Sequence, residues 1–255
     1  MMIDFHCHLD DLRFDEDRDE IIKRSKENGI KIIVNPSIDF KSFEKILIIN
    51  EKFNFILPML GIHPYNADNI NVNNFSEEFE LILKKYKNKI IGIGEVGLDF
   101  NYTKENKDKQ VEILDIQLKI AEKFNLPVVL HIRESFNDVF SIIKKHNVLP
   151  IWHSFVGSYS QARKFLDFGG YLSLSGIITF KKANDLRSVI NKIPLDRLLI
   201  ETDAPYLTPE PLRSQRNEPF FIKYTYNFLE DYFQYRDLKE IINENFKNIF
   251  KIKNY

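Results

Sequence analysis

The chain has 255 residues, of which 44% are hydrophobic and 29% charged, and its formal net charge at pH 7 is −1. These values are typical of a globular protein with one sizeable core, so we expect a single domain over residues 1–255. A charge so close to zero excludes a protein that coats nucleic acid non-specifically. It allows a nuclease that contacts the end of a strand locally.

The cysteine content and the N-terminal segment indicate the compartment. The single cysteine, Cys7, cannot form an intrachain disulfide, which is consistent with a reducing environment. The N-terminus runs directly into Ile3-Asp4-Phe5-His6, and no apolar run is long enough to cross a bilayer. We therefore expect a cytoplasmic protein that does not enter a membrane, and nothing in the sequence implies an obligate protein partner.

Short apolar runs alternate with amphipathic stretches along the chain. The runs predict strands at 3–8, 31–36, 55–63, 90–99, 128–133, 150–155, 171–178 and 198–203. Helical spacing predicts helices at 19–28, 42–52, 76–86, 111–124, 136–146, 160–168, 186–192, 220–233 and 238–250. Eight strands, each followed by a helix, predict an α/β protein of the (β/α)8 TIM barrel type. An open doubly wound sheet also alternates strand and helix, but it has no use for polar residues at the ends of so many strands.

The first predicted strand carries two histidines at its end. Asp4, His6 and His8 alternate, so their side chains share the face that a barrel turns to its interior. Two histidines at this position are typical of metal ligands. Asp4 either accepts a hydrogen bond from a ligand imidazole or is a buried acid bonded to backbone. Cys7 points to the other face, where we expect a small core residue.

The fourth predicted strand is apolar except for Glu95 and Asp99. A carboxylate at the end of a buried strand is costly unless cations surround it. Two metal ions bridged by Glu95 would provide that environment. The glycines of this run lack the spacing of a dinucleotide-binding loop, and we expect them to relieve crowding around the site.

Polar side chains also end three later strands. His131 and Arg133 share a face, where His131 suits a metal and Arg133 suits either an anionic substrate oxygen or a rim carboxylate. His153 ends the sixth strand in the same way. Asp203 ends the eighth strand, where it could hold a metal ion and take a proton from an attacking water.

The remaining histidines and a group of aromatic residues are less specific. His63, ahead of Pro64, either contacts the phosphate or leaving group of a substrate or only fixes its loop. His146 is expected to be a surface residue at a helix end, and we assign it no role. The aromatic residues of segment 220–233 could stack on nucleobases, but their helical spacing favours packing against the barrel.

Six segments together resemble the TatD-type metal-dependent deoxyribonucleases over essentially the whole chain. They are Asp4-Phe5-His6-Cys7-His8-Leu9, Gly61-Ile62-His63-Pro64, Gly94-Glu95-Val96-Gly97-Leu98-Asp99, His131-Ile132-Arg133, His153-Ser154-Phe155 and Glu201-Thr202-Asp203-Ala204-Pro205-Tyr206-Leu207-Thr208-Pro209. The resemblance implies a TIM barrel of the amidohydrolase superfamily that hydrolyses DNA phosphodiesters with divalent metal, typically from a 3′ end. It also implies the metal ligands His6, His8, Glu95, His131, His153 and Asp203.

The chain departs from the family pattern at Ser214 and Gln215, where the family usually has glycine and lysine. The departure concerns the shape of one loop and one phosphate contact.

The resulting hypothesis is a two-metal 3′–5′ exonuclease acting on single-stranded DNA ends. Glu95 bridges two divalent ions, either Zn²⁺, Mn²⁺ or Mg²⁺, of which His6 and His8 hold one and His131 and His153 the other. Glu95 and Asp203 are the predicted catalytic residues, with Asp203 as general base, and His63 and Arg133 position the phosphate. The alternatives are hydrolysis of another ester or amide, such as the aminoacyl ester of tRNA, and a non-catalytic binding protein on the same scaffold.

Overall fold

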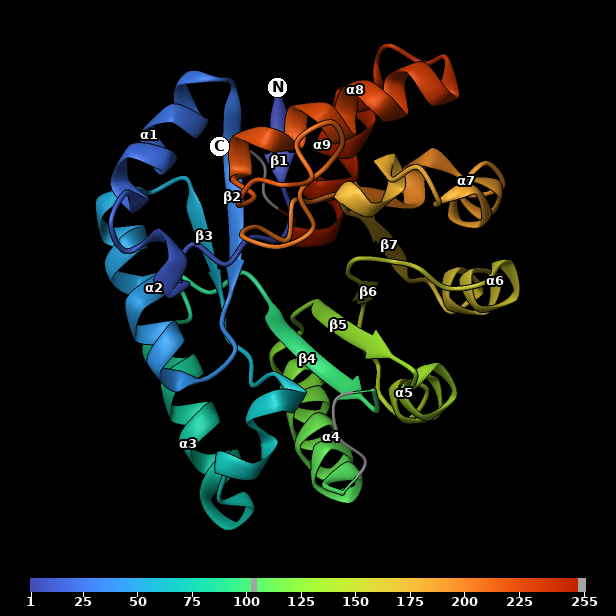
Figure 1. The fold of residues 1–255 in the computed structure, drawn as a ribbon. Coiled ribbons are helices and arrows are strands. Elements are labelled where there is room, and N and C mark those ends of the chain that lie inside the picture. Colours follow the sequence, from blue (N-terminus) through green and yellow to red (C-terminus); the bar gives the residue numbers. More distant parts are fainter. Residues whose placement is uncertain (102–104, 252–255) are drawn as a thin grey trace.

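A computed structural model of the protein describes residues 1–101 and 105–251 (Figure 1). Its strands are β1 (Met2–Asp4), β2 (Ile30–Pro36), β3 (Ile56–Met59), β4 (Ile93–Asp99), β5 (Val128–Arg133), β6 (Pro150–Trp152), β7 (Tyr171–Leu174) and β8 (Leu198–Ile200). Its α-helices are α1 (Arg18–Glu27), α2 (Phe40–Lys52), α3 (Val72–Lys85), α4 (Lys107–Phe124), α5 (Phe136–Ile143), α6 (Tyr159–Asp167), α7 (Asn184–Ile190), α8 (Ile222–Phe233) and α9 (Leu238–Phe250).

The strands form a closed parallel barrel. Strands β1 to β3 pair in sequence order, and so do β4 to β8. Isolated bridges close the two gaps: Leu60 with Ile93, and Cys7 with Ala204. At the second gap, the amide of Asp203 donates to the carbonyl of His6 at 2.8 Å. An open sheet would leave β1 and β8 unpaired, so the predicted barrel is confirmed.

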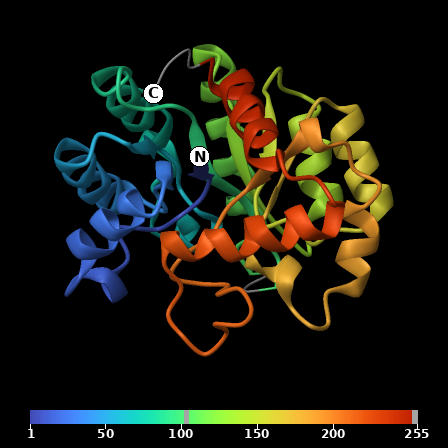
Figure 2. The ribbon, with the colours of Figure 1, turned by 90° about the horizontal axis from the view of Figure 1, so that it is seen from above.

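The helices surround the strands on the outside (Figures 1 and 2). Helices α1 to α3 cover one side of the barrel and α4 to α7 the other, whereas α8 and α9 lie beside β1. Tyr226 of α8 is fully buried and donates its hydroxyl to the carbonyl of Ile3 at 3.1 Å. Asn245 of α9 donates to the carbonyls of Leu195 and Leu198, both at 2.8 Å. The two C-terminal helices therefore bind β1 and β8, the strands that close the barrel.

Two glycines of β4 allow its backbone to approach the neighbouring strand β5 closely. At Gly97, where φ is +148°, an added Cβ would overlap the carbonyl oxygen of His131. At Gly94 it would lie 2.7 Å from the Cβ of Val129. A side chain at either position would push β4 away from β5. The expectation that these glycines relieve crowding is confirmed.

Several strands are shorter than the sequence pattern predicts. The first ends at Asp4, the sixth at Trp152 and the eighth at Ile200, so His6, His8, His153 and Asp203 lie in the loops just beyond. At β1 the chain stays beside β2 and β8 past the regular ladder because single backbone pairings continue there. One of them joins the amide of His8 to the carbonyl of Ala204 at 2.8 Å.

The expectation that His146 is a surface residue is wrong. The expectations of core packing for the aromatic residues of 220–233 and for Cys7 are confirmed. His146 is 7% exposed, and its Nε2 lies 2.9 Å from Oδ1 of Asp115 on α4. The side chain is covered because the segment after α5 places it against Asp115 and Glu122 of α4, which no local pattern could show. Among the aromatic residues of 220–233, Tyr226 lies in the core, and Phe220, Phe228 and Phe233 pack against it. Cys7 is a fully buried core residue.

No helix in the described part of the chain is long and apolar enough to cross a bilayer.

Candidate metal centre

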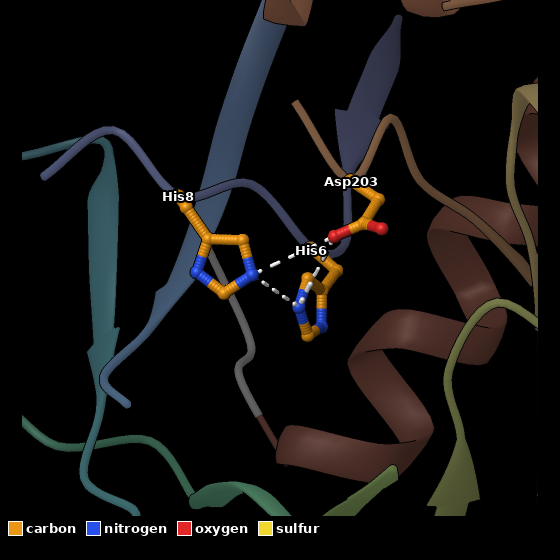
Figure 3. Close-up of side chains that lie close together, drawn as sticks. All are labelled: His6, His8 and Asp203. Atoms are coloured by element: carbon orange, nitrogen blue, oxygen red, sulfur yellow. Dashed lines mark hydrogen bonds and ion pairs between the residues drawn. The ribbon is translucent and has the colours of Figure 1, made fainter. Parts of the chain in front are cut away.

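The loops after β1 and β8 bring His6, His8 and Asp203 together (Figure 3). The Nε2 atoms of His6 and His8 lie 3.2 Å apart. Oδ1 of Asp203 lies 3.5 Å from Nε2 of His8 and 3.8 Å from Nε2 of His6. Two imidazoles and one carboxylate thus converge at one point, and we call them the first ligand set.

A second set of imidazoles converges on one oxygen of Glu95. Oε1 of Glu95 lies 2.8 Å from Nε2 of His153 and 2.9 Å from Nδ1 of His131. Nε2 of His63 lies 3.4 Å from the same oxygen. His131 and His153 come from the ends of β5 and β6, and His63 precedes a short 3-10 helix after β3. We call His131 and His153 the second ligand set, and His63 lies beside it.

Glu95 lies between the two sets and divides its oxygens between them. Its Oε1 faces the second set, and its Oε2 lies 3.3 Å from Nε2 of both His6 and His8. Glu95 is buried in the interior of the barrel. A carboxylate with one oxygen toward each of two imidazole groups has the geometry of a bridging ligand.

The charges of the cluster suit a cation. Burial opposes ionisation of Glu95, but the histidines around it hold its pKa well below the usual value. Burial also opposes protonation of His8, yet hydrogen bonds with Asp203 and Glu95 raise its pKa well above 6.5. The carboxylates therefore stay ionised and attract positive charge. Imidazole nitrogens together with carboxylate oxygens are the donors that divalent transition ions prefer, so these residues fit metal ions.

Asp99 sets the orientation of His131. Its Oδ2 lies 3.0 Å from Nε2 of His131, so it accepts the Nε2 proton and directs Nδ1 toward Glu95. This carboxylate–histidine pairing is common behind metal sites. The sequence analysis assigned Asp99 no role. A signal existed, because residues 95 and 99 on one strand share a face.

Of the two roles predicted for Asp4, the structure shows the second, a buried acid that is hydrogen-bonded to backbone. Its carboxylate accepts hydrogen bonds from the amide of Thr202 at 2.8 Å and from the hydroxyl of Thr202 at 2.6 Å. Burial raises its pKa well above the usual value. Asp4 therefore ties β1 to the segment after β8 and is not the partner of a ligand imidazole.

His63 is held in one tautomer. Its Nδ1 accepts a hydrogen bond from the amide of Tyr65 at 3.1 Å, so the ring proton resides on Nε2, which faces Glu95. Burial lowers the pKa of His63 to about 4. The side chain is a neutral hydrogen-bond donor at the edge of the cluster.

A cavity of about 360 Å³ opens above the cluster, and its lining includes His8, Asp203, Glu95 and the second ligand set. Its walls include two exposed tyrosines that the sequence analysis missed, Tyr65 and Tyr206. Tyr65 packs edge-on against His63 with ring centroids 4.5 Å apart, and Arg13 lies 4.0 Å over the ring of Tyr206. Nη1 of Arg133 lies 3.4 Å from the hydroxyl of Tyr65 and 3.9 Å from Oδ2 of Asp99.

The loop that departs from the family pattern is held by other residues. Asn217 is fully buried and donates to the carbonyl of Thr202 at 3.0 Å. Arg216 pairs with Asp17 at 2.6 Å. Ser214 and Gln215 are exposed, so the two exchanged side chains do not hold the loop beside Asp203.

A TIM barrel with buried imidazoles and carboxylates at the carboxyl ends of its strands has the architecture of a metal-dependent hydrolase. The family described as TatD related DNase matches residues 3–251. The chain therefore belongs to this family, whose curated relatives are mostly named metal-dependent hydrolases.

Individual relatives agree with this assignment. The chain is 35% identical over 257 residues to the uncharacterized metal-dependent hydrolase YabD of Bacillus subtilis (strain 168), covering 99% of this chain and all of the relative. It is 30% identical to the human protein named deoxyribonuclease TATDN3, covering 89% of this chain and 86% of the relative. The crystal structure of YJJV, a TatD homolog from Escherichia coli K12, superposes with a TM-score of 0.91 at 28% identity, covering 98% of both chains.

Proposed function

We propose that this metal-dependent hydrolase cleaves DNA phosphodiester bonds at single-stranded 3′ ends with two divalent cations, and that residues 1–255 act as one barrel domain. The observation that carries the proposal is the position of Glu95, with one carboxylate oxygen toward each ligand set. The activity on DNA and the 3′ end rest on the family pattern, and the name of the human relative supports DNA.

In this proposal the ligands divide between two sites. His6, His8 and Asp203 would hold one cation, His131 and His153 would hold the other, and Glu95 would contribute an oxygen to each. Bound cations of this kind polarise phosphoryl oxygens, lower the pKa of water and stabilise a leaving oxygen. Asp99 supports the proposal because it leaves Nδ1 of His131 free to face the second site.

Asp203 serves as the general base. Burial opposes its ionisation, but the hydrogen bond with His8 and the nearby histidine charges lower its pKa. The carboxylate is therefore ionised at neutral pH and can accept a proton from the water that attacks phosphorus. The P–O3′ bond then breaks, and a nucleotide with a 5′ phosphate is released.

The cavity walls suit one nucleotide at the end of a strand. Arg133 offers a guanidinium to the phosphate, and His63 offers the Nε2 proton that its tautomer requires. The exposed rings of Tyr65 and Tyr206 offer faces to a base. A net charge of −1 provides no field that would hold long duplex DNA, which favours the end of a strand.

The test is an activity screen of metal-stripped protein that is reloaded separately with Zn²⁺, Mn²⁺ or Mg²⁺. Single-stranded DNA, duplex DNA, RNA and aminoacyl-tRNA are offered in parallel, and the DNA carries a label at its 5′ end. We expect single-stranded DNA to shorten one nucleotide at a time from the 3′ end. Faster hydrolysis of aminoacyl-tRNA than of any DNA would replace DNA with a carboxylic ester as substrate. Stoichiometric metal binding without turnover would indicate a binding protein.

A further inference from the structure

Glu201 is a buried carboxylate that neither ligand set uses. It is fully buried, two residues before Asp203, and its Oε1 accepts a hydrogen bond from the amide of Ser154 at 2.8 Å. Its Oε2 has no hydrogen-bond partner among the described residues. An unpartnered carboxylate oxygen in a protein interior is costly, so its persistence calls for a donor that becomes available when the site is loaded.

One histidine of each ligand set lies close to Glu201. The Nδ1 atoms of His6 and His153 are also buried and lack hydrogen-bond partners in the described part of the chain. Nδ1 of His153 lies 3.4 Å from Oε1 of Glu201. One ring nitrogen of each histidine and one carboxylate oxygen of Glu201 all lie within 4.8 Å of one another.

The two imidazoles belong to different ligand sets but share one orientation. Their rings stack with centroids 4.3 Å apart and an interplanar angle of 14°. Each turns Nε2 toward Glu95. An imidazole whose Nε2 lone pair binds a cation keeps its proton on Nδ1, so both rings then have a proton to donate on the side away from Glu95.

We propose that Glu201 is a positioning residue shared by the two cation sites. It accepts the Nδ1 proton of His153 directly and that of His6 across a gap that one water molecule bridges. In this way one carboxylate fixes the tautomer of a ligand in each set. The inference rests on the proposed pair of cations but does not depend on the substrate.

Asp99 supplies the matched comparison. It is also a buried carboxylate that lies beside a ring nitrogen of a metal ligand. The ligand it contacts is His131, which belongs only to the second ligand set. Replacing Asp99 should therefore weaken one cation, and replacing Glu201 should weaken both. The substitutions Glu201→Gln and Asp99→Asn keep the side-chain volume and remove the charge.

The experiment is a Zn²⁺ titration of the metal-free wild type and of both variants against a competing chelator, with bound zinc measured by atomic emission. We expect two equivalents in the wild type. Glu201→Gln should lose about 10- to 100-fold in affinity at both sites. Asp99→Asn should lose affinity at one site and retain the other. Wild-type affinities in Glu201→Gln, or loss at a single site, would overturn the shared role.

Two further measurements separate this role from a structural one. Thermal unfolding of each metal-free variant shows how much stability the substitution itself removes, and the zinc-induced rise in Tm shows the effect on binding. A smaller zinc-induced rise for Glu201→Gln than for the wild type supports positioning, whereas equal rises contradict it. If Glu201→Gln does not fold, Glu201→Asp keeps the charge but shortens its reach, and it should also weaken both sites.

A wild-type stoichiometry of one zinc would refute the two-cation assignment and the shared role together. Two equivalents with an unaffected Glu201→Gln would refute the shared role alone. The zinc titration and the thermal unfolding use no nucleic acid. Their outcome for Glu201 therefore holds even if DNA proves not to be the substrate.

Discussion

Two imidazoles of the cluster are directed by what their second nitrogens contact. Asp99 holds Nε2 of His131, and the amide of Tyr65 holds Nδ1 of His63. These contacts decide which nitrogen faces Glu95 and whether it presents a lone pair or a proton. The first ring is thereby suited to bind a cation and the second to donate to a substrate oxygen.

The assignment of Asp203 as general base predicts a specific loss. Asp203→Asn keeps the size of the side chain but removes its ability to accept a proton, so kcat on single-stranded DNA should fall about 10²- to 10⁴-fold. Steady-state kinetics and a circular dichroism spectrum like that of the wild type would support the assignment. Asp167→Asn, on exposed helix α6 and paired with Arg163, is the control and should retain full activity. Undiminished cleavage by Asp203→Asn would refute the role.

Arg133 should act on binding more than on the chemical step. Its guanidinium is half-exposed at the cavity wall, where it can reach a phosphate oxygen beside the reacting bond. For Arg133→Ala we expect KM for a DNA end to rise about tenfold, with a smaller change in kcat. Arg163→Ala removes an exposed arginine of α6 and should leave both constants unchanged. An unchanged KM in Arg133→Ala would leave this residue without its proposed contact.

At the scale of elements, the sequence predicted the order of strands and helices because period-two and helical patterns are local properties. It placed the ends of strands too late, as at β1 and β8, since alternation continues where single bridges replace the ladder. The burial of His146 was missed for another reason. Its partner Asp115 lies on a helix 31 residues earlier in the chain, and no local pattern reports that contact.

The contact of β4 with β5 depends on the missing side chain of Gly97. In Gly97→Ala the new Cβ would overlap the His131 carbonyl in a backbone conformation that alanine resists, so we expect a loss of about 2–5 kcal/mol in unfolding free energy. Gly169→Ala is the matched control. Its φ is +94°, but no atom of the described residues lies within 4 Å of an added Cβ. Only the cost of the backbone conformation remains, about 1 kcal/mol. The unfolding free energies of both variants are measured by urea denaturation. Equal losses in Gly97→Ala and Gly169→Ala would contradict the packing argument.

At the scale of the whole molecule, the cluster links stability to metal and to pH. Hydrogen bonds and charge attraction from carboxylates raise the pKa of His8, His131 and His153 although burial opposes this. A histidine with a raised pKa in the folded protein stabilises it fully below 6.5 and loses that contribution as the pH rises. Asp4, whose pKa burial raises, acts in the same direction.

The metal-free protein should therefore lose stability as the pH rises above 6.5, so it should be less stable at about pH 8 than at pH 6.5. Divalent cations replace the lost protons, and a metal concentration about 1,000-fold above Kd should add about 4 kcal/mol to the unfolding free energy. Urea denaturation at both pH values, with a chelator and then with Zn²⁺, measures the two effects. Rising stability of the metal-free protein over this interval would contradict the charge assignment of the cluster.

The sequence by itself determined the barrel and the side chains that would gather at its rim, because periodicity and position at a strand end can be read locally. The tertiary structure alone decided how Glu95 divides its oxygens, which ring nitrogen of His131 faces inward, and that Glu201 lies beside histidines of both sets. These features depend on distances of a few ångströms between segments up to about two hundred residues apart. A local pattern carries no information on such distances, and the closure of β1 against β8 fixes them.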